Sequence, residues 1–293
     1  MGISRMLKRR VLIVGCGALG GVLVDVLGPC ADVKVVDPHP RAKVKKHLLC
    51  TPQELHGQAF DGLMVATKCY DFKRALKALK GNIIVPRVLF LQNGILNLDE
   101  IKSYWPEVMI VRGVTESAVG IASQKAIFHY RGNFYLAPED DQGHEAVGWF
   151  WRLLSDAGLK TSLVSKSASI IWAKLIFSSV MNPLPVITRQ GYDILKRDKI
   201  IWGLVRQAVG EGRAVARALG VRLAFDPLRL IHRVRDGDLA GIAHRGSIFQ
   251  DLSAGKPTEL DFITGALIRQ ARLVGIKTPA LDSILFRAKS AGA

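Results

Sequence analysis

The chain has 293 residues, of which 49% are hydrophobic and 23% charged, a balance typical of globular proteins that excludes a largely disordered chain. The net charge of +16 would suit anionic ligands, but the basic residues are scattered and no nucleic-acid-binding motif is recognisable, so we expect no nucleic-acid partner. The four cysteines form no C-x-x-C pair, which argues against a disulfide framework or a zinc site and favours a cytoplasmic, metal-free protein.

The first predicted elements are a strand over Val11–Val14, a helix over Ala18–Leu27 and a strand over Val33–Val36 that ends in Asp37. A glycine turn between strand and helix offers N–H groups and the positive end of the helix dipole to a pyrophosphate. An acid at the end of the second strand can accept hydrogen bonds from a ribose diol. The spacing G-x-G-x-x-G therefore predicts a dinucleotide site made of Gly15, Cys16, Gly17, Ala18, Leu19, Gly20 and Asp37.

An export signal is the alternative for this segment. Basic residues precede the first apolar run, and Ile13–Cys16 resembles a bacterial lipoprotein cleavage box. A signal needs about 7–15 apolar residues, and the run here is shorter. It would also leave the three glycines and Asp37 without a role, so we favour the dinucleotide site.

Strand and helix patterns alternate through the rest of the first half. We expect strands over Gly62–Ala66, Ile83–Val85, Val88–Leu91, Met109–Val111 and Thr161–Val164, and helices over Asp71–Lys80 and Gly143–Ala157. Alternation near Ile127–Tyr130 and Asn133–Leu136 suggests a hairpin at the sheet edge. Residues 1–166 are therefore predicted to form an α/β domain, a Rossmann-type doubly wound parallel sheet.

Residues 167–293 show helical spacing only and predict a second, all-helical C-terminal domain. The expected helices are Ala168–Met181, Lys199–Leu219, Pro227–Arg235, Ala240–Leu252, Glu259–Val274 and Pro279–Lys289. Thr258 with Asp261 matches a capping box, and Thr278 before Pro279 suits an N-cap. The most apolar stretch, Ile170–Thr188, is interrupted by a lysine, an asparagine and two prolines, so we expect no membrane span.

Polar residues inside apolar patterns are the candidates for chemistry. Lys174 lies among apolar neighbours; either its stem packs while its head reaches water, or it is a proton donor. Asn182 falls near the same helical face two turns later, although it could simply end the helix before a proline. Asn93 follows a strand at the edge where such sheets bind ligands, or forms an ordinary Asn-Gly turn. Lys68 has the same location after its own strand, with a solvated surface lysine as the alternative.

Four segments together resemble the ketopantoate reductase family: GCGALGG at 15–21, LQNGI at 91–95, WAKLIFSSVMNPL at 172–184 and SIFQDLSAGKPTELDFITGALIRQARLVGIKTP at 247–279. The resemblance implies NAD(P)H-dependent reduction of 2-dehydropantoate to (R)-pantoate, on the route to pantothenate and coenzyme A, usually with NADPH. It implies that Lys174 is the general acid, that Lys68 contacts the cofactor, and that Asn93 and Glu259 lie near cofactor and substrate. Asn182 and Ser247 match substrate-binding positions.

Two departures from the family pattern leave alternatives open. Ser178 stands where the family commonly has a second asparagine, and a serine offers fewer bonding groups to a substrate. A D-2-hydroxyacid dehydrogenase acting on another branched 2-keto acid is therefore an alternative, as is a non-catalytic dinucleotide-binding protein.

The second departure concerns the cofactor. Asp37 and Pro38 stand where many members have an arginine for the 2′-phosphate of NADPH. A carboxylate there favours NADH, whereas Arg41 and Lys43 could still reach the phosphate, so the choice between NADPH and NADH stays open. The expected partner is a small 2-keto acid, with no membrane; a homodimer is compatible with the sequence.

Overall fold

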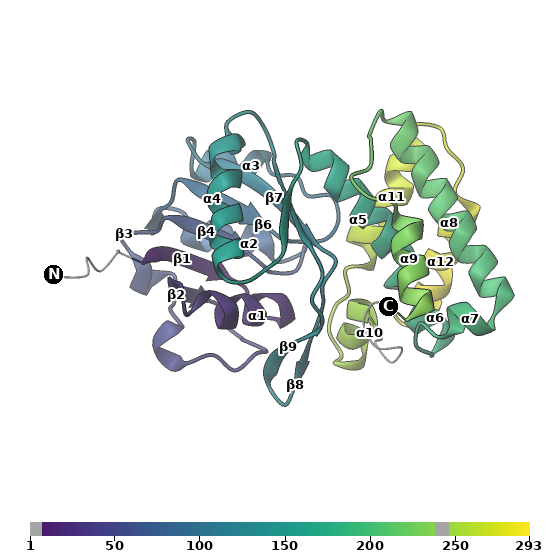
Figure 1. The fold of residues 1–293 in the computed structure, drawn as a ribbon, viewed down its shortest axis with the longest axis horizontal. Helices are drawn as coiled ribbons and strands as arrows, with labels where there is room; N and C mark the ends of the chain where they lie inside the picture. Colours follow the sequence, from purple (N-terminus) through teal and green to yellow (C-terminus); the bar gives the residue numbers. More distant parts are fainter. Residues whose placement is uncertain (1–7, 238–245) are drawn as a thin grey trace. The chain divides into compact units, whose positions relative to one another are not determined.

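The computed structural model describes residues 8–237 and 246–293. The chain forms two compact units: a sheet unit, Met1–Gln92 with Asn97–Ser167, and a helical unit, Asn93–Leu96 with Ala168–Ala293 (Figure 1). The sequence predicts the domain boundary between residues 166 and 167, where alternating strand and helix patterns give way to helical spacing only. It gives no sign that the short segment Asn93–Leu96 belongs with the helices.

The sheet unit contains a seven-stranded sheet of order β11-β10-β7-β6-β4-β1-β2. Neighbours from β2 to β7 are parallel, β10 is antiparallel to β7, and β11 is parallel to β10. The expected Rossmann-type α/β sheet is therefore confirmed, with the antiparallel pairing of β10 as its one departure from a parallel sheet among the described strands. The strands are β1 (Arg9–Val14), β2 (Ala31–Val36), β4 (Gly62–Val65), β6 (Arg87–Phe90), β7 (Met109–Thr115), β10 (Phe134–Pro138) and β11 (Thr161–Leu163).

Helices cover both faces of this sheet, which is why its central strands are apolar without alternation. Val11 and Ile13 of β1 share a buried cluster with α1 (Ala18–Leu27) and α4 (Gly143–Asp156). On the other face, Phe72 of α2 (Phe72–Leu79) meets Phe90 of β6 edge-to-face, with ring centroids 6.1 Å apart. The unit also contains the short helices α3 (Asp99–Tyr104), η1 (Lys46–Leu48) and η2 (Gln53–Leu55).

The expected hairpin between Ile127–Tyr130 and Asn133–Leu136 is wrong. The strand β9 (Lys125–Tyr130) pairs instead with β8 (Ala118–Ala122) in a separate two-stranded sheet, whereas β10 joins the main sheet. Ser123 and Gln124 connect β8 to β9 with φ of 47° and 62°, the left-handed backbone of a two-residue type I′ turn. Because that turn usually carries Asn-Gly, these residues gave no hairpin signal. A second small sheet pairs β3 (Gln58–Ala59) with β5 (Ile83–Ile84).

Most helices of the helical unit pack around one large buried cluster, and Ile248 of α10 joins a smaller one with Val186, Leu260 and Ala288. Gly212 of α8 lies so close to Ile176 of α5 and Leu267 of α11 that a Cβ there would be 2.9–3.4 Å from their side chains. Residues 240–245 of the expected helix Ala240–Leu252 lie outside the described residues. The helices are α5 (Ser167–Met181), α6 (Leu184–Thr188), α7 (Ile194–Arg197), α8 (Lys199–Ala218), α9 (Pro227–Asp236), α10 (Gly246–Ser253), α11 (Leu260–Leu273) and α12 (Pro279–Ser290).

Of the two expected helix caps, the one at Thr258 is wrong and the one at Thr278 is confirmed. The capping box at Thr258 is wrong, because α11 has Glu259 as its N-cap residue and no side chain caps it. Thr278 is the N-cap of α12, but the N–H groups of Ala280 and Leu281 donate to the two carboxylate oxygens of Glu211, at 2.9 Å each. An acid from α8 thus stabilises the positive end of α12.

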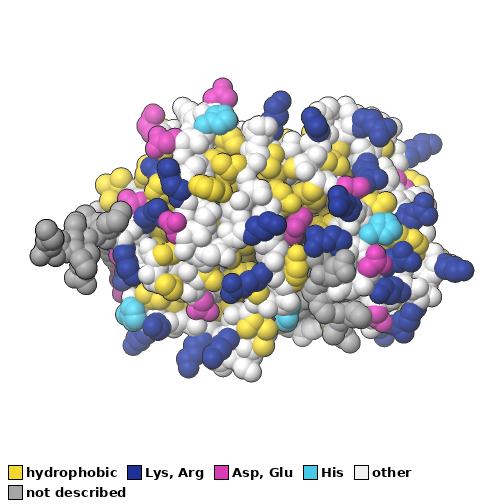
Figure 2. Space-filling model, viewed as in Figure 1, with side chains coloured by type: hydrophobic (Ala, Val, Ile, Leu, Met, Phe, Trp, Pro, Cys, Tyr) yellow, Lys and Arg dark blue, Asp and Glu magenta, His cyan; other side chains and the backbone are white. Residues whose placement is uncertain are grey.

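The stretch Ser167–Thr188 is long and apolar enough to cross a membrane by length and composition, but 72% of its window is buried inside the protein. It forms α5 and α6, which belong to the core of the helical unit. Figure 2 shows lysine and arginine side chains spread over the visible face rather than gathered in one patch.

Candidate functional site

The three glycines after β1 are required by the local geometry. Gly15 has a φ of +92°, and a Cβ there would lie 2.7 Å from the backbone nitrogen of Thr67. A Cβ on Gly20 would lie 1.9 Å from the carbonyl oxygen of Gly15. By contrast, a Cβ on Gly17 would meet no described atom within 4 Å. Gly15 therefore permits the tight turn and Gly20 the close approach of α1 to the loop, whereas Gly17 leaves the space in front of the loop open.

The N-terminus of α1 is suited to an anion. Gly17 is its N-cap residue, no side chain caps it, and its first turn contains no acid. Ala18 and Leu19, the first helical residues, are half-buried. The unused N–H groups and the partial positive charge of a helix start attract phosphate. The residues present therefore fit the pyrophosphate of a dinucleotide.

Asp37 is fixed at the end of β2 by the backbone. One carboxylate oxygen accepts the N–H of Cys16 at 2.6 Å, and the other accepts the N–H of His39 at 2.8 Å. Burial, followed by the nearby negative charges of Asp37 and Asp25, raises the pKa of the Cys16 thiol to about 12. The carboxylate therefore holds the glycine loop against β2 and places a negative charge beside it.

Lys68 lies close to the same loop, because the backbone of the preceding Thr67 abuts Gly15. Gln92, at the end of β6, donates from its side-chain nitrogen to the Thr67 hydroxyl at 3.2 Å. Its side-chain oxygen is buried and accepts no hydrogen bond from the residues that the structure describes. Nothing in the sequence marks Gln92, since an amide before Asn-Gly is easily assigned to a turn.

In the helical unit, Lys174, Ser178 and Asn182 follow at intervals of four along α5 and therefore share a face. The N–H of Asn182 donates to the carbonyl of Ser178 at 3.1 Å, so the helical turn continues past Met181. Lys174 is half-buried, with its ammonium nitrogen 5.1 Å from the ring centroid of Phe177. The Ser178 hydroxyl is buried and has no hydrogen-bond partner within the described part of the chain.

The start of α10 packs against the end of this face. Gly246 has a φ of +61°, and a Cβ there would lie 3.6 Å from the carbonyl oxygen of Asn182 and 2.7 Å from the Tyr192 hydroxyl. Ser247, the next residue, is half-buried. The fold therefore brings Ser247 to the neighbourhood of Asn182, although 65 positions separate them in the sequence.

Glu259 and Asn93 belong to the same unit. Glu259 is 4% exposed at the start of α11, and that helix is tied to α5 where the Thr264 hydroxyl donates to the carbonyl of Ser179 at 3.0 Å. Asn93 is half-buried and precedes Gly94, which has a φ of +86°. The chain therefore bends at Asn93 and Gly94, as an Asn-Gly pair favours.

The predicted site residues accordingly form two groups. The sheet unit brings the glycine loop, Asp37 and Lys68 together, and the helical unit contains Lys174, Ser178, Asn182, Ser247, Glu259 and Asn93. Within residues 8–237 and 246–293, no group of three His, Cys, Asp or Glu residues could hold a metal ion. The roles of the individual residues remain predictions.

Known proteins resemble both units. A family model described as "Ketopantoate reductase PanE/ApbA" matches residues 11–138, and one described as "Ketopantoate reductase PanE/ApbA C terminal" matches residues 167–290. A 2-dehydropantoate 2-reductase of Archaeoglobus fulgidus is 28% identical over 288 residues, covering 92% of this chain and 94% of the relative. One of Pyrococcus abyssi is 24% identical, covering 92% and 93%.

Solved structures show the same fold. A ketopantoate reductase from Ralstonia eutropha JMP134 has a TM-score of 0.80 at 25% identity, covering 96% of this chain and 97% of its own. A D-mandelate dehydrogenase, in a ternary structure with NADH and anilino(oxo)acetate, has a TM-score of 0.83 at 23% identity with the same coverage. Since the two family models together span both units, the chain belongs to the ketopantoate reductase family.

Proposed function

We propose that this protein reduces 2-dehydropantoate to (R)-pantoate with a nicotinamide dinucleotide. The observation that carries the proposal is the face of α5 with Lys174, Ser178 and Asn182, in a chain whose sheet unit has a glycine loop suited to a pyrophosphate. The curated relatives that match 92% of the chain are 2-dehydropantoate 2-reductases, which gives the substrate.

When bound, the reduced dinucleotide supplies the hydride that the keto carbon receives. Lys174 donates the proton that the carbonyl oxygen needs, so that the C=O bond becomes CH–OH and the lysine leaves the step neutral, to be reprotonated from water. Apolar neighbours limit hydration of its ammonium group and strengthen its attraction to a developing alkoxide. Asn93 orients the keto group.

The remaining polar residues of the helical unit hold the substrate. Asn182 and Ser247 offer donors and acceptors to the hydroxyl and carboxylate groups of a 2-keto acid. Glu259, being buried, suits an acceptor for a substrate or ribose hydroxyl. In the sheet unit, Lys68 provides a cation for the cofactor beside the glycine loop.

For the cofactor we propose NADH in preference to NADPH. Both oxygens of the Asp37 carboxylate are held by backbone N–H groups, so the group cannot swing away from a 2′-phosphate. Two unit charges about 5 Å apart at an effective dielectric constant of about 20 repel by roughly 3 kcal/mol. The backbone of Arg41 is close, since its N–H donates to the carbonyl of Cys16 at 3.0 Å, and its guanidinium is the cation that would oppose this repulsion.

The cofactor preference is tested by comparing kcat/KM for NADH and NADPH. We expect NADH to be favoured, and Asp37→Asn to shift the ratio toward NADPH by about tenfold or more. A wild-type preference for NADPH would refute the role given to Asp37 and would leave the proposed reaction standing.

A different branched 2-keto acid is the second candidate substrate. The specific observation is Ser178, whose buried hydroxyl has no hydrogen-bond partner among the residues that the structure describes. A D-mandelate dehydrogenase shares the fold, and a fold alone does not select among substrates.

Initial rates with 2-dehydropantoate and a panel of branched 2-keto acids decide between these substrates. We expect 2-dehydropantoate to give the highest kcat/KM. A higher value for a simple branched acid would favour the dehydrogenase. Absence of turnover on every acid, with NADH binding retained, would favour a non-catalytic dinucleotide-binding protein.

A further inference from the structure

One face of α8 contains arginine side chains and two exposed glycines. Arg206, Arg213 and Arg217 are separated by seven and four residues, a spacing that aligns them along the helix. Gly203 and Gly210 lie on the same face, are exposed, and would place a Cβ in open space with no described atom within 4 Å. Glycine is a poor helix former, and two of them in an exposed helix interior leave the backbone of this face accessible.

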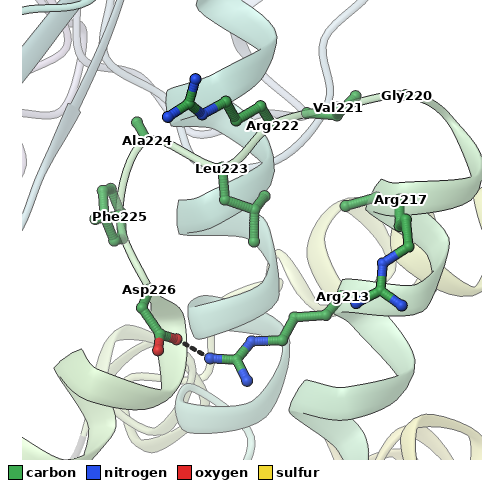
Figure 3. A pocket seen from close by; sticks show the side chains of 10 residues that line it. Arg213, Arg217, Gly220, Val221, Arg222, Leu223, Ala224, Phe225 and Asp226 are labelled. Atoms are coloured by element: carbon green, nitrogen blue, oxygen red, sulfur yellow. Dashed lines mark hydrogen bonds and ion pairs between the residues drawn. The ribbon is translucent and has the colours of Figure 1, made fainter.

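Two open hollows adjoin this face and share Arg213. The larger, of about 670 Å³, lies between the end of α8 and the segment 220–226. Arg217 and Arg222 line it together with the apolar side chains of Leu223 and Phe225 (Figure 3). The smaller, of about 440 Å³, is lined by Gly203, Arg206, Gln207, Arg213 and Leu228. We call the two hollows together the α8 groove.

The acidic side chains near the α8 groove, Asp226 and Glu211, already have bonding partners. Asp226 forms an ion pair with Arg213 and accepts the N–H of Leu228 at 2.8 Å (Figure 3). Glu211 is bonded to the start of α12. Arg206, Arg217 and Arg222 form no ion pair within 4 Å with any residue that the structure describes, so the groove has surplus positive charge.

We propose that the α8 groove binds a phosphate-bearing small molecule of the nucleotide class, at a site other than the glycine loop of the sheet unit. Guanidinium groups present paired N–H donors that match the oxygens of a phosphate. Phe225 and Leu223 offer an apolar surface to a base. Volumes of this size suit a small ligand, whereas the scattered arrangement of the remaining basic residues favours a small ligand over a nucleic acid.

The test measures binding of ATP and of inorganic tripolyphosphate to the full chain by calorimetry, with NADH kept saturating so that the glycine loop is filled. We expect saturable binding of ATP. The double variant Arg217→Ala/Arg222→Ala should weaken it by about tenfold or more. The matched control Arg272→Ala/Arg287→Ala removes two exposed arginines elsewhere in the helical unit and should weaken it by less than about twofold.

Three results would overturn the proposal: no saturable binding of either probe to the wild type, equal weakening by both double variants, or tighter binding of a single-stranded RNA oligonucleotide with the same arginine dependence. Without saturable binding, the groove has no ligand of this class. Equal weakening by both double variants would mean that only the net charge of the protein matters. Tighter binding of the RNA would make the partner a nucleic acid. Retained NADH binding shows that the variants are folded. Arg217→Lys/Arg222→Lys keeps the charge but loses the paired donors, and should lie between the wild type and the alanine pair.

Discussion

Replacing Gly20 by alanine would place a methyl carbon 1.9 Å from the carbonyl oxygen of Gly15. Ordinary contact between such atoms is more than 1 Å longer, so either α1 must move away from the loop or the loop must unwind. Overpacking of this kind costs about 1–3 kcal/mol, and each kcal/mol lowers the melting temperature of a unit of this size by about 2–4 °C. We expect Gly20→Ala to lose both stability and NADH affinity.

Gly17→Ala is the matched control, because a Cβ at that position meets no described atom within 4 Å. It should leave the melting temperature of the free protein unchanged, yet weaken NADH binding by about tenfold, since the methyl group would occupy the space that the pyrophosphate needs. Thermal denaturation followed by fluorescence titration with NADH separates the two effects. Unchanged NADH affinity of Gly17→Ala would refute the placement of the pyrophosphate at this loop.

Two further predictions concern groups outside the reaction. Glu211→Ala should lower the free energy of unfolding by about 2 kcal/mol in urea denaturation, because two charge-assisted hydrogen bonds to the start of α12 are lost. Glu211→Gln keeps one acceptor and should lower it by less. An equal loss of stability in both variants would contradict the role of these hydrogen bonds. The raised pKa of the Cys16 thiol, about 12, keeps the thiol protonated in the folded protein. An alkylating reagent at pH 8 should therefore modify Cys30 before Cys16, as mass spectrometry can detect. Modification of Cys16 first would contradict the burial of its thiol. Because the unfolded thiol loses its proton near its ordinary pKa while the folded one retains it, this group should also lower stability as the pH rises from about 9 toward 12.

Local signals predicted much of the fold. The helix expected at Ala18–Leu27 has those bounds in the structure, because the glycines before it and the apolar spacing within it specify both its start and its buried face. The strands β1, β4 and β6 also lie where apolar runs indicated. By contrast, the β8–β9 hairpin depends on a left-handed turn at Ser123 and Gln124, which these residue types seldom adopt.

The site was harder to predict where contacts are long-range. The sequence placed Asp37 at the end of β2, but not that backbone N–H groups hold both of its oxygens. The contact between Gly246 and Asn182, which brings Ser247 to the face of α5, is invisible to any spacing rule. The same holds for Glu211, whose partners in α12 lie about 70 residues away. Such pairs are set by tertiary packing, which single-sequence patterns do not contain.

The most direct measurement is the turnover of Lys174→Ala with 2-dehydropantoate, beside NADH affinity and the exposed control Lys277→Ala. We expect Lys174→Ala to lose about 10²–10⁴ in kcat with unchanged NADH binding, and Lys277→Ala to turn over normally. Lys174→Ala turning over at the wild-type rate would contradict the assignment of the proton to this lysine.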